Sequence, residues 1–177
     1  LFKNEHNSVA SARESGLART YNNNFQGSAS FTYKIIDGLS LRGNASTTFN
    51  LKDEHTFLRS MKFYTAESVD PIRTTRSSVE NKDNKMLEVN LQAYLDYAKT
   101  FGKHDLKGLL GYSQLYNQYR ILGASRKDLP LNNSLGEINA GDITTQTSEG
   151  NMVEYALRSA FARVNYTFDN RYLLEAN

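Results

Sequence analysis

The stretch "GLSLRGNASTTFNL", Gly38 to Leu51, decides the fold because its side chains alternate in kind. From Leu39 onward, mostly apolar or small residues take the odd positions and polar residues take the even positions. Successive side chains of an extended chain point to opposite faces, so this period of two predicts a β-strand with one face that avoids water. Whether that face contacts a protein core or lipid is the central question.

The same period extends on both sides of this stretch. Residues 25–36 alternate in the same way and end at Asp37-Gly38, a strong signal for a β-hairpin. We therefore expect a hairpin over residues 25–51, a second over 87–113 and a third over 154–177. Arg158 and Phe161 interrupt the alternation in the third hairpin, which leaves its register open there.

Stretches without alternation separate the hairpins. We expect loops over residues 1–24, 52–86 and 114–153, with a helical turn within "VASARESGLA", Val9 to Ala18. The connections inside the hairpins are short, at Asp37-Gly38, Gly102 to Asp105 and Asp169 to Arg171. Short and long connections thus alternate along the chain.

Composition excludes several classes of protein. The 21 Lys and Arg residues are spread among 19 acids for a net charge of +2, which argues against a nucleic-acid surface. Cysteine is absent, so disulfides and thiolate metal sites are impossible. No apolar run is long enough for a transmembrane helix. We find no arrangement of residues typical of catalysis, metal binding or cofactor binding, and we expect no enzyme.

Strand length and loop asymmetry together favour a membrane barrel. Each predicted strand spans roughly a dozen residues, whereas soluble strands average about 5–6 and a tilted transmembrane strand needs about 9–11. Tight turns on one side and long loops on the other are typical of outer-membrane barrels. The fold class we expect is all-β, with about six antiparallel up-and-down strands of a transmembrane β-barrel. Residues 25–36 should run toward the periplasm, and residues 39–51 back outward.

About six strands cannot close a barrel by themselves. Hydrocarbon offers no partner for free backbone groups, so a sheet crosses a membrane only when it closes on itself. The strand that begins at Tyr172 also has no partner after it. We therefore expect that the chain is a piece of a longer one that supplies the remaining strands.

A soluble antiparallel sheet that packs on one side gives the same alternation. In that alternative, the chain is a soluble or cell-surface β-sheet module that binds carbohydrate or acts as an adhesin. The two hypotheses differ in the surroundings of the apolar faces. A continuous outward belt favours the barrel, and faces that pack together favour the module.

The polar face of the strands carries candidate lumen-facing residues. Their side chains want water or polar partners, which a wet lumen supplies. The plain alternative is that they are solvated or mutually paired wall residues. The set comprises Arg42, Asn44, Glu88, Asn90, Gln92, Asp96, Arg163 and Asn165.

Tyrosines gather near the start of the third predicted loop. Tyr112, Tyr116 and Tyr119, with neighbouring Arg120, are candidate ligand-contacting residues, since an aromatic face suits the apolar side of a sugar ring. More often such tyrosines form an interfacial girdle or pack within a loop.

The later part of the chain resembles a known family. "LLGYSQLYNQYRILGASRKDLPLNNSLGEINAG", Leu109 to Gly141, and "LRSAFARVNYTFDNRYLLEAN", Leu157 to Asn177, resemble the SusC/RagA family of TonB-dependent outer-membrane transporters from Bacteroidetes. "YKIIDGLSLRGNAS", Tyr33 to Ser46, looks like that family's hairpin, and Ser8 to Tyr33 looks like the segment that leads into it. One departure is mild: Ala160 and Ala162 replace an aromatic residue and a glycine.

The resemblance implies a barrel of roughly 22 strands with a plugged lumen in the cell outer membrane. Such a barrel imports glycan oligosaccharides or peptides with energy passed on by TonB. The partners it implies are a SusD-like surface lipoprotein, TonB through a plug domain that this sequence lacks, outer-membrane lipid and the cargo. The chain itself would be part of the barrel wall with its extracellular loops.

Overall fold

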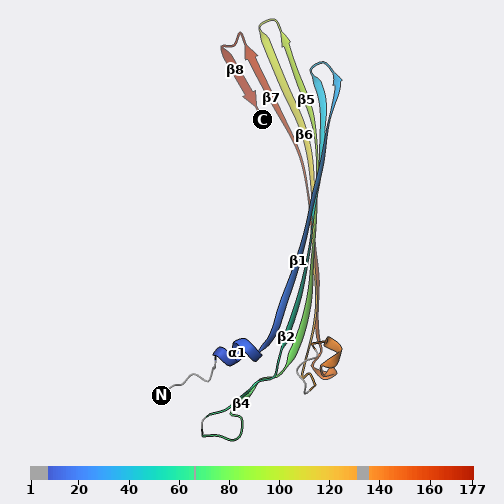
Figure 1. The fold of residues 1–177 in the computed structure, drawn as a ribbon. Coiled ribbons are helices and arrows are strands. Elements are labelled where there is room, and N and C mark those ends of the chain that lie inside the picture. Colours follow the sequence, from blue (N-terminus) through green and yellow to red (C-terminus); the bar gives the residue numbers. More distant parts are fainter. Residues whose placement is uncertain (1–7, 66, 131–135) are drawn as a thin grey trace. The chain divides into compact units, whose positions relative to one another are not determined.

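A computed structural model describes residues 8–65, 67–130 and 136–177 of the chain. Its main sheet has six strands in the order β1-β2-β5-β6-β7-β8, so neighbours in space follow the order of the chain (Figure 1). These strands are β1 Gly16–Ile36, β2 Leu39–Leu58, β5 Ser78–Phe101, β6 His104–Lys127, β7 Thr147–Phe168 and β8 Tyr172–Ala176. A separate small hairpin pairs β3 (Lys62–Phe63) with β4 (Arg73–Thr74). The predicted up-and-down all-β architecture is confirmed.

The strands are longer than the sequence indicates. β2 has 20 residues and β5 and β6 have 24 each, so all three extend into the stretches predicted as loops at 52–86 and 114–153. β1 likewise begins at Gly16, inside the predicted loop 1–24, and β7 begins at Thr147. The extensions do not alternate, because residues 80–85 of β5 are polar on both faces and residues 119–122 of β6 include apolar side chains on both faces. Backbone pairing with the neighbouring strand is sufficient to hold them extended.

The N-terminal segment contains a short helix, α1 (Ser8–Glu14), within the region where a helical turn is predicted. Across the described ranges, no helix has the length and apolar character needed to cross a membrane.

The chain divides into two compact units. The first, which we call the loop unit, comprises Leu1–Asn23, Leu51–Lys85 and Arg120–Met152. The second, which we call the turn unit, comprises Asn24–Asn50, Met86–Tyr119 and Val153–Asn177 and contains the three short turns.

Each short turn contains at least one residue with a positive φ, which is the left-handed backbone conformation. Gly38 has a φ of 82°, Gly102 a φ of 59°, and Asp169 and Asn170 have φ of 50° and 52°. The connection has the two residues that Asp-Gly predicts, but Asp37 keeps a negative φ, so the turn is not of type I′, which needs two left-handed residues.

The apolar face of the turn unit stays exposed. Phe31 is 59% exposed, Leu110 is 56% exposed, and Leu91, Leu95 and Tyr33 are similarly open. The buried hydrophobic side chains among the described residues are Phe57, Val79 and Leu129, all of which belong to the loop unit. The strands of the turn unit therefore do not bury their apolar face in a protein core, as a soluble one-sided sheet requires.

An aromatic ring compensates for a glycine on this apolar face. The ring of Phe31 on β1 lies over Gly43 on β2, so closely that a Cβ atom at position 43 would be 2.2 Å from the ring. Gly43 makes room for the ring, and the ring shields the glycine backbone. Such pairing fixes the register of neighbouring strands.

The small hydrophobic core of the loop unit anchors the connection between β6 and β7. Phe57, Val79 and Leu129 pack together, with Ile138 and Ala140 against them. Ile138–Ala140 forms the 3-10 helix η1 and Ile143–Thr145 forms η2, both coloured orange in Figure 1. The start of this connection is also tied to the residues before β5, because the backbone N–H groups of Asp128 and Leu129 donate to the O and Oγ of Ser77, at 2.9 and 2.8 Å. This connection is therefore folded against the strands.

Two carboxylates make the connection sensitive to acid. The Arg76 guanidinium hydrogen-bonds to Asp128 and lowers the pKa of that carboxyl. The backbone N–H of Thr144 donates a hydrogen bond to the Asp142 carboxyl and lowers its pKa. A carboxyl with a lowered pKa stabilises the fold above its ordinary pKa of about 3.9, and this stabilisation is lost as the pH falls through the lower folded value.

We therefore expect acid to loosen residues 136–146. Amide hydrogen exchange, corrected for its intrinsic pH dependence, should show protection at pH 7 that falls when the pH drops below about 3.9. Asp128→Asn should show weakened protection already at pH 7, whereas Asp53→Asn, which removes an exposed carboxylate from β2, should behave as wild type. Protection that does not change between pH 7 and pH 2 would contradict the expectation.

Candidate functional site

The polar face of the turn unit is organised around an arginine. Arg42 on β2 donates from Nε and Nη2 to the two carboxylate oxygens of Asp96 on β5, at 2.6 and 2.7 Å. Its guanidinium also lies 5.3 Å from the centroid of the Tyr94 ring. A fork of this kind fixes both side chains in a planar arrangement.

Further contacts continue this face across β5, β6 and β7. Asn117 donates to the Glu88 carboxylate at 3.3 Å. The ring of Phe161 on β7 lies over Gly111 on β6, where an added Cβ would be 2.2 Å from the ring. Phe161 also meets Tyr94 edge to face at a centroid distance of 5.9 Å. The face is thus a mixture of paired charges, amides and rings.

The structure places the predicted polar residues on this one face. Arg42, Glu88 and Asp96 are joined to it by the contacts above, and Asn44, Asn90 and Gln92 share it by the alternation of β2 and β5. On β7, Arg163 and Asn165 alternate in step with Phe161, and Arg163 donates to the Asn177 side chain at 2.7 Å. Within this set, Arg42 and Asp96 pair with each other, whereas Glu88 and Arg163 pair with residues outside it.

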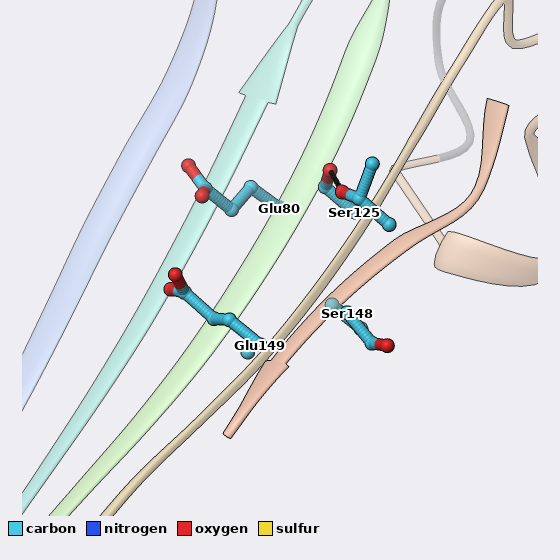
Figure 2. A pocket seen from close by; sticks show the side chains of 7 residues that line it. Glu80, Ser125, Ser148 and Glu149 are labelled. Carbon is cyan, nitrogen blue, oxygen red and sulfur yellow. Dashed lines mark hydrogen bonds between the residues drawn. The ribbon is translucent and has the colours of Figure 1, made fainter. Parts of the chain in front are cut away.

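A polar hollow of about 140 Å³ lies in the loop unit. Its lining residues come from β5, β6 and β7, and the carboxylates of Glu80 and Glu149 project side by side while Ser148 points away from them (Figure 2). Ser125 and Thr147 share a hydrogen bond of 2.6 Å between their hydroxyls. Hydroxyls and carboxylates together give the hollow both donors and acceptors.

A lysine joins the two carboxylates of this hollow. Lys82 on β5 lies 3.0 Å from Glu80 and 3.1 Å from Glu149, which is on β7. The bridge to Glu149 joins β5 to β7 across the strand between them, and Gly123 on β6 leaves room for it. A Cβ at position 123 would be 2.9 Å from Glu149 Cγ and Oε1, so a larger residue there would make the Glu149 side chain move.

Sequence reasoning missed the hollow because its residues lie in the strand extensions. Glu80 and Lys82 belong to a run charged on both faces, and Gly123 follows apolar residues on both faces. A period of two is not visible in either place. The signal that was available is the Gly-Ala pair 123–124 within an otherwise strand-forming run, since an isolated glycine in a strand often marks a close approach of another group.

The tyrosine candidates lie within β6 and not in a loop, and the structure does not gather them on one face. Tyr112 and Tyr116 lie on the apolar side, where they contact Gln114 and Gln118 at 3.3 and 3.2 Å. Arg120 shares their side by alternation, and Tyr119 faces the opposite way. Their nearness in sequence therefore does not bring all three tyrosines together, and their contact with a ligand stays a prediction.

A scan against protein-family models found no match. Among curated proteins, TonB-dependent receptor P3 from Formosa agariphila is 31% identical over 158 residues, which cover 88% of this chain and 14% of that receptor. The chain therefore spans a small part of the length of this relative.

Solved structures share the fold. The RagAB peptide transporter matches with a TM-score of 0.73 and 19% identity over 89% of this chain and 17% of that chain. The RagAB peptide importer matches in its closed-closed state with a TM-score of 0.72 and 18% identity, over 89% of this chain and 17% of that one. In its open-open state the TM-score is 0.68 and the identity 21%, over 86% of this chain and 16% of that one.

Proposed function

Because this chain is part of the β-barrel of a TonB-dependent receptor, consistent with the SusC/RagA family, we propose that it serves the import of oligosaccharides or peptides across the outer membrane. Its role is to form barrel wall and extracellular loops. The observation that carries the proposal is the contrast between the two faces of the turn unit. One face exposes large apolar side chains and the other holds paired charges and amides.

This contrast fits a wall between lipid and water. Apolar side chains face hydrocarbon at no cost, and the closed sheet satisfies the backbone. Arg42, Glu88 and Asp96 then face a water-filled lumen, together with the other residues of the polar face. The connections at 59–77 and 128–146 lie on the extracellular side, and the three short turns on the periplasmic side.

The polar hollow supports a cargo rich in hydroxyl or amide groups. Its Ser125 and Thr147 hydroxyls can donate and accept hydrogen bonds, and its two carboxylates can accept them from the hydroxyl or N–H groups of sugars and peptides. Tyr112 and Tyr116 have a different role in this proposal. On the apolar face, both contact lipid, and Tyr116, the farther of the two from the short turns, belongs to an aromatic girdle at the membrane interface. A SusD-like lipoprotein outside and TonB inside complete the transporter.

The alternative is a soluble sheet module that binds carbohydrate or acts as an adhesin. It requires the apolar faces to pack together, and in the turn unit those faces are exposed. The exposure therefore favours the transporter.

Uptake by cells tests the proposal. Deletion of the gene for the full-length receptor should abolish accumulation of a labelled oligosaccharide or of a labelled peptide mixture, and a protonophore should do the same in wild-type cells. Membrane fractionation should place the receptor in the outer membrane. A receptor recovered as a monodisperse protein without detergent, with unchanged uptake of both cargo classes after deletion, would refute the proposal.

A further inference from the structure

Lys99 lies on the apolar face of the turn unit, close to the turn between β5 and β6. Lys99 follows Leu95 and Tyr97 in the odd positions of β5, and its Nζ lies 5.1 Å from the centroid of the Phe101 ring. Within the described part of the chain, no carboxylate lies within ion-pair distance of this ammonium group. A lysine stem can lie along apolar surface while its charged end reaches a polar layer.

Aromatic side chains continue from Phe101 along the same end of the sheet. Phe101 and His104 flank the two-residue turn between β5 and β6, so they share a face. His104 lies 5.0 Å from Phe168, and Phe168 lies 6.4 Å from Tyr172 between ring centroids. The Tyr166 hydroxyl contacts His104 Nδ1 at 2.5 Å. We call Phe101, His104, Phe168 and Tyr172 the aromatic row.

The turns beside the aromatic row carry an excess of positive charge. Lys103 and Arg171 lie 3.1 and 3.8 Å from the same carboxylate, that of Asp169. Two cations therefore share one anion, and Lys99 adds a third cation on the apolar side. An anionic group that approaches this end of the apolar face meets a positive field.

We propose that Lys99 and the aromatic row bind the phosphate group of an anionic phospholipid in the leaflet at the turn end of the strands. This inference rests on the proposed barrel, whose apolar face contacts lipid. Tyrosine and other amphipathic rings mark the headgroup level of a membrane, and a lysine there is attracted to anionic lipid. The acyl chains of the same lipid cover the apolar side chains of the turn unit, which explains why the site opens onto that face. A soluble phosphate ion would make no favourable contact with the aromatic rings or with the apolar surface.

Native mass spectrometry of the full-length receptor tests the inference. The purified receptor is exchanged into an equimolar mixture of phosphatidylglycerol and phosphatidylethanolamine, and the lipid that remains bound is counted. Wild type should retain phosphatidylglycerol preferentially. Lys99→Gln should lower this preference about fivefold, and Lys99→Arg should retain it.

Lys34→Gln is the matched control. It removes the same charge at the turn end of β1, on the face opposite to Lys99, and should leave the preference unchanged. An unchanged preference in Lys99→Gln, or an equal loss in Lys34→Gln, would overturn the inference. Displacement of the bound phosphatidylglycerol by millimolar inorganic phosphate would also overturn it, because the lipid would then not be the specific source of the phosphate.

Membrane fractionation, done before the receptor is purified, distinguishes a failure of this inference from a failure of the proposed function. Wild-type receptor that does not fractionate with the outer membrane would remove the basis of the proposed function. Receptor that does so, yet shows no preference between the two lipids, would overturn only the lipid site.

Discussion

Leu110→Arg should destabilise the folded receptor by about 2–4 kcal/mol, the cost of arginine near the middle of the lipid-facing surface of a barrel. Leu110 lies on the exposed apolar face of β6, six positions after the first residue of that strand, His104. A tilted strand crosses hydrocarbon in about 9–11 residues, which places this position near the centre of the membrane. The measurement is urea unfolding of the full-length receptor in lipid vesicles, followed by its heat-dependent mobility on electrophoresis.

The neighbouring residue provides the control. Leu109→Arg makes the same exchange one position earlier on the same strand, and its side chain points to the polar face. If that face is wet, this variant should unfold within about 1 kcal/mol of wild type, since surface substitutions are usually small in effect. Equal destabilisation by both variants would argue against lipid on one side and water on the other.

Gly38→Ala should have the second large effect, because two constraints meet at this turn. The φ of 82° costs a residue with a Cβ about 1–2 kcal/mol. In addition, the new Cβ would lie 2.3 Å from the backbone oxygen of Ala98, and backbone atoms cannot rotate away. Relief of the clash would stretch the hydrogen bond of 2.7 Å from Ala98 N–H to Gly38 O, at a further cost of roughly 1–3 kcal/mol.

Gly102→Ala separates the two constraints. Gly102 also has a positive φ, of 59°, but nothing lies within 4 Å of its added Cβ. This variant should be destabilised only by the cost of a positive φ for a residue with a Cβ, about 1–2 kcal/mol. The midpoint of heat-dependent mobility, measured for both variants side by side, should fall further for Gly38→Ala. A fall of equal size in the two variants would mean that the contact with Ala98 does not constrain the turn.

The parts of the strands near the short turns were predictable from the sequence, and their far ends were not. Between Phe25 and Leu51, one face must avoid water and the other must meet it, so the residues alternate and the hairpin is visible. Between Glu80 and Lys85, both faces are polar, so the sequence gives no signal that the strand continues. In such a region the strand is recognised only by its backbone hydrogen bonds to a neighbouring strand. These hydrogen bonds cannot be inferred from one sequence alone.

The polar face was partly predictable for the same reason. Alternation places Arg42 and Asp96 on one side, but their bidentate contact depends on the register between β2 and β5. Sequence spacing alone does not indicate that register, and the Phe31 ring over Gly43 constrains only the pairing of β1 with β2. The tyrosines of β6 show the converse, because residues near in sequence were expected to cluster and instead point to opposite faces.

The bridge from Lys82 to Glu149 over Gly123 has a mechanical consequence. If β6 slid by two residues, every side chain would keep its face, but Ile121 or Ser125 would take the place of Gly123 beneath the bridge. Either side chain would push the lysine and the glutamate apart. The absence of a side chain at Gly123 therefore disfavours such a shift, and the bridge couples β5 to β7 although β6 lies between them.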